Sequence, residues 1–169
     1  MAGATRAPAK SVVVIGVGNN LRGDDGAGLA AAARLRGEPG IQVRTSAGEG
    51  IDLLAMWEDA GAVLLVDAVR SGAPAGTIHR YDVSDEPLPS SPRRPAGHAI
   101  STSDAIELAR QLGQLPAKVV VFGVEGGRFE TGSALSPAVE AAIEPLVAAV
   151  ATESRRLLAD ARLRAGSAS

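Results

Sequence analysis

The chain has 169 residues, of which 46% are hydrophobic, and its aromatic residues are one Trp, one Tyr and two Phe. This length suits one domain with one core, and the apolar content excludes a disordered chain. The net charge of −2 gives no electrostatic reason to expect nucleic acid or an anionic membrane as a partner. Because cysteine is absent, the sequence excludes disulfides, a zinc–thiolate site and a cysteine nucleophile.

The two ends of the chain differ in composition from its middle. We expect one α/β domain at residues 11–158, with residues 1–10 and 159–169 as flexible termini. Residues 1–10 lack the apolar stretch of a secretory signal, and no apolar run approaches the ~20 residues of a membrane span. We therefore expect a cytoplasmic protein. The Pro-rich stretch from Ser84 to Gly97 predicts a loop.

Short apolar runs predict the strands. Three runs are continuous, as in parallel strands covered on both faces: Val12–Val17, Val63–Val66 and Val119–Val124. Two further runs, at residues 41–44 and 78–81, alternate between apolar and polar residues and predict half-exposed edge strands.

Apolar residues at helical spacing fill the gaps between the strands. They predict helices at residues 24–36, 50–60 and 99–113 and a last helix around 137–150. Ser136 is the expected N-cap of this last helix, with Pro137 at its first position. We expect Pro145 to kink it.

The order of these elements predicts the architecture. Alternating strands and helices favour a three-layer α/β/α sandwich around a mainly parallel, twisted, five-stranded sheet. A parallel crossover needs about a dozen residues or more, and the link Arg70–Gly76 is shorter than that. The strand at 78–81 is therefore expected to be an antiparallel edge strand.

Polar side chains follow the predicted strands at the edge where open α/β sheets bind ligands. Asp24 and Asp25 follow the first strand, Asp67 ends the third, and His98 precedes the helix at 99–113. A carboxylate that ends a run such as VLLV is costly to bury unless it is paired, protonated or metal-bound. A carboxylate that only accepts backbone hydrogen bonds remains the alternative for Asp67. We expect Asp24 to cap the following helix and Asp25 to face the cleft.

The glycine-rich turn after the first strand also raises nucleotide binding. Gly16 and Gly18 match the opening of G-x-G-x-x-G, but Leu21 stands at the third glycine position. The second strand ends at Thr45 and Ser46, where an acidic residue would contact a ribose. Two aspartates in this turn would also repel a phosphate. Nucleotide binding therefore stays a minor alternative.

A first motif and six further segments, in a fixed order, carry a resemblance to a known family. They are Gly16-Val17-Gly18-Asn19-x-Leu21-x-x-Asp24-Asp25-Gly26-x-Gly28, Gly48-x-Gly50-x-x-Leu53-Leu54, Val66-Asp67-Ala68, Pro74-x-Gly76-Thr77, His98, Gly123-Val124-Glu125 and Leu135-Ser136-Pro137-x-Val139. Over about residues 11–150 the chain resembles the hydrogenase maturation peptidases, which process the large subunits of nickel–iron hydrogenases. The resemblance implies a phosphorylase/hydrolase-like α/β fold.

The resemblance also implies a site and an activity. The three metal-binding positions of the family fall on Asp25, Asp67 and His98, although Gly97 precedes His98 where the family usually has a small polar residue. The implied enzyme is a monomeric, aspartic-type or metal-dependent endopeptidase. It would remove the C-terminal extension of a nickel–iron hydrogenase large-subunit precursor and recognise nickel that the precursor supplies, for which other divalent ions could substitute. Glu125 would support the site or contact the substrate.

Several alternatives remain open on the sequence alone. Two carboxylates and an imidazole suit nickel and leave coordination positions open, but a non-catalytic nickel chaperone would show the same residues. An enzyme acting on a small molecule is disfavoured by the scarcity of aromatic residues. A serine mechanism through Ser46 or Ser101 lacks the G-x-S-x-G elbow. The second histidine, His79, is expected to be solvated on its edge strand.

Overall fold

The computed structural model describes residues 11–89 and 100–167. The expectations for residues 1–10, for most of the Pro-rich loop and for His98 lie outside these ranges. Within them, five strands form one sheet in the order β2-β1-β3-β5-β4. The strands are β1 (Val12–Val17), β2 (Ile41–Ser46), β3 (Ala62–Val69), β4 (Ile78–Asp82) and β5 (Lys118–Glu125).

The sheet is parallel except at one edge. β1 pairs in parallel with β2 and β3, and β3 pairs in parallel with β5. β4 runs antiparallel to β5 at the edge, as the short link before it predicted. The central strands β1, β3 and β5 contain the three continuous apolar runs, because both of their faces are covered.

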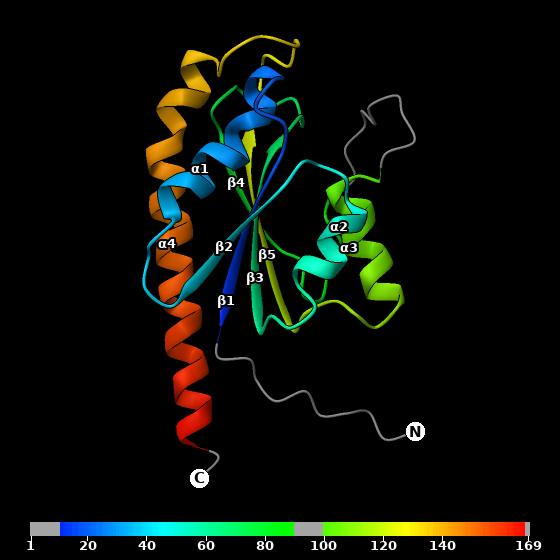
Figure 1. The fold of residues 1–169 in the computed structure, drawn as a ribbon, viewed down its shortest axis with the longest axis vertical. Coiled ribbons are helices and arrows are strands. Elements are labelled where there is room, and N and C mark those ends of the chain that lie inside the picture. The colour runs from blue at the N-terminus through cyan, green and yellow to red at the C-terminus, as the bar shows by residue number, and fades with distance from the viewer. Residues whose placement is uncertain (1–10, 90–99, 168–169) are drawn as a thin grey trace.

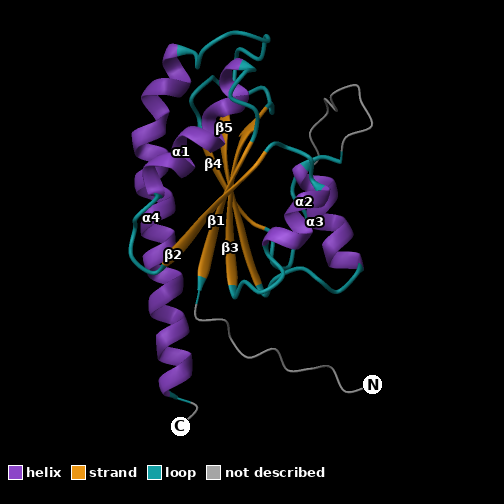
Figure 2. Ribbon diagram, in the orientation of Figure 1, coloured by secondary structure: helices purple, strands orange, loops and turns teal. Residues whose placement is uncertain are grey.

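Helices cover both faces of the sheet and complete the predicted three-layer sandwich (Figures 1 and 2). One core lies between the sheet and α1 and α4, and a second lies between the sheet and α2 and α3. The helical elements are the 3-10 turn η1 (Gly23–Gly26), α1 (Ala27–Leu35), α2 (Ile51–Met56), α3 (Thr102–Gln111) and α4 (Pro137–Gly166). Among the described residues, none of these helices combines the length and apolar character needed to cross a bilayer.

The last helix is longer than the sequence pattern suggested. α4 runs unbroken through Pro145 and ends at Gly166, so it includes residues 159–166, which were expected to belong to a flexible terminus. Residues 159–165 contain only Ala, Asp, Arg and Leu, with neither Gly nor Pro to end the helix. Arg156 also pairs with Asp160 one turn further on, at 3.2 Å between Nη1 and Oδ2.

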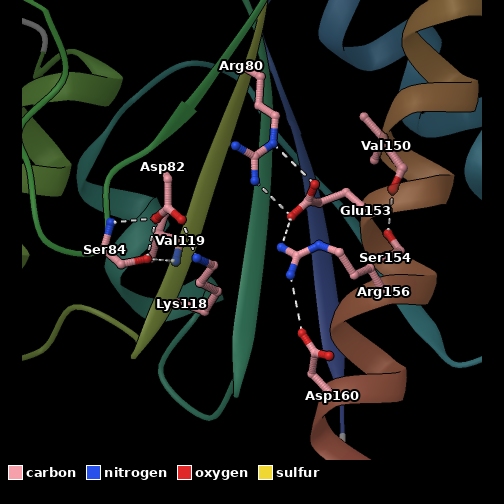
Figure 3. A network of polar contacts seen from close by, with 10 residues as sticks. All are labelled: Arg80, Asp82, Ser84, Lys118, Val119, Val150, Glu153, Ser154, Arg156 and Asp160. Carbon is pink, nitrogen blue, oxygen red and sulfur yellow. Dashed lines mark hydrogen bonds and ion pairs between the residues drawn. The ribbon is translucent and has the colours of Figure 1, made fainter.

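Ion pairs hold the edge strand β4 against α4 (Figure 3). Arg80 donates from Nε and Nη2 to the two carboxylate oxygens of Glu153, at 3.1 and 3.0 Å, and Arg156 donates to the same carboxylate. Burial alone would raise the pKa of Glu153, but the hydrogen bonds from Arg80 and Arg156 hold it below its usual value. At its end β4 is also tied to β5, because Asp82 pairs with Lys118.

The glycines around β1 let α1 approach the sheet closely. A Cβ on Gly16 would lie 2.4 Å from the carbonyl oxygen of Gly28, and a Cβ on Gly28 would lie 2.3 Å from that of Val66. Gly18 has a φ of +142°, and a Cβ there would lie 1.9 Å from the carbonyl oxygen of Asp25. The G-x-G pattern therefore has a packing reason that needs no nucleotide, and it brings η1 to the carboxyl edge of the sheet.

Candidate functional site

Asp67 lies near the carboxyl end of β3, in register with Gly123 of β5. Its side chain is half-buried and accepts a hydrogen bond from the hydroxyl of Thr102, at 2.8 Å to Oδ2. Burial raises the pKa of Asp67 to about 7. The Thr102 hydrogen bond and the Ala68 N–H oppose this rise, and the negative charge of Asp25 adds to it. This carboxyl group therefore takes up a proton far more readily than an ordinary aspartate.

Asp25 reaches the same rim from η1. The N–H of Asn19 donates to its Oδ2 at 3.1 Å and to its carbonyl oxygen at 3.2 Å, so the turn after β1 fixes its position. Its charge acts on Asp67, which places the two carboxylates within electrostatic reach of each other. The structure thus brings two of the three predicted ligands to one rim, and their metal-binding role stays a prediction.

The third predicted ligand, His98, lies outside the described residues. The described part of the chain resumes at Ile100, and α3 begins at Thr102 beside Asp67. Within residues 11–89 and 100–167, no group of three or more His, Cys, Asp or Glu side chains could hold a metal ion. The two aspartates therefore account for the described part of the predicted site.

Asp24 does not cap the following helix, so that prediction is wrong. Its fully buried carboxylate accepts hydrogen bonds from the N–H groups of Gly127, Arg128 and Ser136, at 2.7 to 2.9 Å, and from the Ser136 hydroxyl at 2.9 Å. Burial would raise the pKa of Asp24, but these hydrogen bonds hold it below its usual value. Asp24 ties η1 to the β5–α4 loop, while its neighbour Asp25 faces the rim.

Glu125 and His79 form a second buried polar cluster at the end of β5. Glu125 is 2% exposed and accepts hydrogen bonds from the N–H and hydroxyl of Ser71 and from the N–H of Gly72. The Nε2 of His79 lies 3.2 Å from Oε2 of Glu125, and the His79 side chain is only 19% exposed. The prediction of a solvated His79 is therefore wrong, because this pairing covers the ring. Glu125 thereby fixes the loop after β3, and its role in the site stays a prediction.

No sequence pattern indicated that Thr102 would contact Asp67. The available signal was the position of Thr102 in the sequence, four residues after His98 and at the start of α3. The serines considered as nucleophiles have other surroundings. Ser46 is buried at the end of β2. Ser101 is the N-cap of α3, where its hydroxyl exchanges hydrogen bonds with Asp104 in a capping box.

The fold and this acidic rim are typical of α/β proteins that bind their ligands at the carboxyl ends of parallel strands. A family model described as hydrogenase maturation protease matches residues 45–153. The hydrogenase expression/formation protein HupD of Rhodobacter capsulatus is 30% identical over 149 residues, which cover 85% of this chain and 71% of that protein. The chain belongs to the hydrogenase maturation protease family, so it is a protease with an endopeptidase role in hydrogenase maturation.

Further comparisons agree on fold and family. The hydrogenase 2 maturation protease of Escherichia coli is 27% identical over 141 residues, covering 79% of this chain and 84% of that protein. The solved structure of the hydrogenase maturating endopeptidase HybD from E. coli superposes with a TM-score of 0.74 at 26% identity, covering 86% of this chain and 93% of that one. Both the family and the fold class predicted from the ordered motifs are confirmed.

Proposed function

We propose that this chain removes the C-terminal extension of a nickel–iron hydrogenase large-subunit precursor after nickel has been inserted, and that it recognises the inserted nickel. The supporting observation is the pair of carboxylates, Asp25 and Asp67, at the carboxyl rim of the sheet, where burial and, to a smaller extent, the charge of Asp25 raise the pKa of Asp67. Family membership supplies the peptidase activity, and this acidic pair supports the part played by the metal.

The chemistry of the pair fits a divalent cation. Two like-charged carboxylates repel each other when both are ionised, and a bound cation removes that cost and displaces the proton from Asp67. With the imidazole of His98, they would form the O,O,N set that nickel accepts, with positions left for groups of the precursor. In this proposal nickel belongs to the substrate, and other divalent ions could substitute for it.

The described residues around the pair have defined tasks. Thr102 and Asn19 each donate a hydrogen bond to one carboxylate oxygen, on Asp67 and Asp25 respectively, which orients the other oxygen of each group. A metal held in this way can polarise a peptide carbonyl. The aspartates would therefore place the metal-bearing end of the precursor at the rim, with the bond to be cleaved beside it.

The test is cleavage of a nickel-loaded precursor by purified variants. We expect Asp25→Asn, Asp67→Asn and His98→Ala to lower the cleavage rate by more than the roughly 10- to 100-fold typical of residues that only support a metal ligand. Asp52→Asn, on the exposed face of α2, is the matched control and should cleave like wild type. Normal processing by the first three variants would refute the proposal.

A non-catalytic nickel chaperone is the competing function, and the same assay separates the two. A chaperone would bind or transfer nickel without releasing the extension. We further propose that the protein acts as a monomer in the cytoplasm, with neither nucleic acid nor membrane as a partner. Light scattering tests whether the protein is a monomer, and cell fractionation tests its location in the cytoplasm.

A further inference from the structure

Two large apolar side chains are exposed at the carboxyl edge of the sheet. Among residues 11–89 and 100–167, the exposed large hydrophobic side chains are Leu21 (66% exposed), Ile51 (51%), Leu112 (56%) and Leu163 (73%). Leu112 and Leu163 lie at the far ends of α3 and α4, because both helices begin at the carboxyl edge and run away from it (Figure 1). Leu21 follows β1 and Ile51 follows β2, so both belong to the edge that carries Asp25 and Asp67.

The turn that holds Asp25 also fixes Leu21. The N–H of Leu21 donates to Oδ1 of Asn19 at 2.9 Å, and the N–H of Asn19 donates to Oδ2 of Asp25 at 3.1 Å. Two residues of chain reach at most about 7 Å, which keeps Leu21 close to the Asp25 carboxylate. The carbonyl oxygen of Leu21 accepts a hydrogen bond from the N–H of Gly132 at 2.7 Å. Both backbone groups of Leu21 are therefore held, and its side chain is presented to solvent from a fixed turn.

A second series of contacts connects Ile51 to Asp67. The N–H of Gly50, the residue before Ile51, donates to the carbonyl oxygen of Ile100 at 2.9 Å. A Cβ on Gly50 would lie 2.6 Å from the same oxygen, so glycine permits this close approach of α2 to the start of α3. Two residues after Ile100, the hydroxyl of Thr102 donates to Asp67. Ile51 therefore lies beside the end of the helix that orients Asp67.

Recognition of nickel within the precursor would bring this edge against the large subunit. Bonds from carboxylate oxygen to a metal are only about 2 Å long, so residues next to the two aspartates would come within contact distance of the subunit that holds the nickel. Neither Leu21 nor Ile51 belongs to the two hydrophobic cores of the domain. Their apolar character is therefore not needed for core packing, and it suits contact with an apolar partner surface that excludes water.

We propose that Leu21, beside Asp25, and Ile51, beside Asp67, form a docking surface for an apolar part of the large-subunit body around its nickel. This rests on the proposed function and deepens it by naming the surface that holds the partner while the acidic pair contacts the metal. Such contacts are made equally in the bound precursor and in the transition state, so they lower KM and leave kcat unchanged.

The experiment measures cleavage of the nickel-loaded precursor by the full chain and its variants. Leu21→Ser and Ile51→Ser should each raise KM by about tenfold, the loss expected when one aliphatic side chain is no longer buried on binding. The kcat of both variants should stay within about twofold of wild type. Leu21→Met keeps a flexible apolar side chain of similar size and should behave like wild type.

The two exposed leucines at the far ends of their helices supply matched controls. Leu112→Ser and Leu163→Ser remove comparably exposed side chains and should leave both KM and kcat unchanged. Asp52→Asn remains a neutral control, because side chains at neighbouring helix positions do not face each other. Urea unfolding should give similar midpoints for all these variants, since exposed side chains contribute little to stability.

A second substrate separates the subunit body from the extension. In this nickel-loaded precursor, every residue of the extension after the first is replaced by a Gly-Ser repeat. Leu21→Ser and Ile51→Ser should raise KM for it by the same factor as for the natural precursor. Loss of that factor would assign the two side chains to the extension and would refute the inference.

The outcomes distinguish this inference from the function on which it rests. If either serine variant keeps the wild-type KM, or lowers kcat with KM unchanged, the docking surface is refuted while the peptidase function stands. If light scattering shows a wild-type dimer that Leu21→Ser dissociates, the surface joins two copies of this chain, which also refutes the inference. If wild type cleaves no precursor, both proposals are wrong.

Discussion

Removing the carboxylate of Asp24 should destabilise the fold while leaving the acidic pair chemically intact. In Asp24→Ala, the N–H groups of Gly127, Arg128 and Ser136 lose the buried carboxylate that accepts their hydrogen bonds. A hydrogen bond to a charged group contributes about 1.5–3 kcal/mol. Because the three donors share one acceptor and the costs overlap, we expect a loss of about 3–5 kcal/mol. Such a loss is a large part of the roughly 5–15 kcal/mol that stabilises a typical domain.

The assay is urea unfolding followed by circular dichroism, with Asp25→Ala as the matched neighbour. Asp25 is half-buried, and among the described residues its carboxylate accepts one hydrogen bond, from Asn19, so its loss should cost no more than about 1 kcal/mol. The Asp24→Ala midpoint should therefore fall well below that of Asp25→Ala, with a similar slope. Equal midpoints for the two variants would refute the assignment of Asp24 to structure and Asp25 to the rim.

Three further predictions follow from the contacts. The pKa of Glu153 is lowered in the folded state, so its ion pairs stabilise the protein above the usual glutamate pKa, and this stabilisation is lost as the pH falls through the folded-state pKa. In urea titrations between about pH 5 and pH 3, the free energy of unfolding of wild type should fall by about 1 kcal/mol more than that of Glu153→Gln. Equal losses in the two proteins would contradict this. Gly28→Ala should lower the free energy of unfolding by about 3 kcal/mol or more, because its Cβ would meet two backbone oxygens. Gly37, with φ at +91°, has open space around it, so Gly37→Ala should lower the free energy of unfolding by only about 1–2 kcal/mol in the same assay. Thr102→Val should lower kcat/KM for the nickel-loaded precursor by roughly 10- to 100-fold and change the free energy of unfolding by less than about 1 kcal/mol. Thr102→Ser keeps the hydroxyl group and should cleave like wild type. Unchanged kinetics of the valine variant would count against the contact with Asp67.

The sequence predicted the sheet well because its signals are local. Continuous apolar runs mark β1, β3 and β5, and the short link after β3 forces β4 to run antiparallel. The ends of elements were less accurate: β3 extends to Val69 because pairing with β5 continues past its apolar run. α4 extends to Gly166 through an i, i+4 ion pair that apolar periodicity does not register.

The site was predicted only in part because much of it depends on contacts distant in sequence. The partners of Asp24 lie more than 100 positions away, at Gly127, Arg128 and Ser136, so no local pattern could separate a helix cap from this role. The pairing of His79 with Glu125 likewise joins two strands, 46 positions apart. Asp67 could be singled out from the sequence because a carboxylate that ends a buried strand requires a reason in any fold, and its metal-binding role stays a prediction.

The measurement that tests the central claim most directly compares wild-type cleavage of one large-subunit precursor with and without nickel. The released extension would be quantified by mass spectrometry under otherwise identical conditions. If the two aspartates recognise nickel carried by the substrate, the nickel-loaded precursor is processed and the nickel-free precursor is not. Equal processing of both precursors would contradict metal recognition by Asp25 and Asp67.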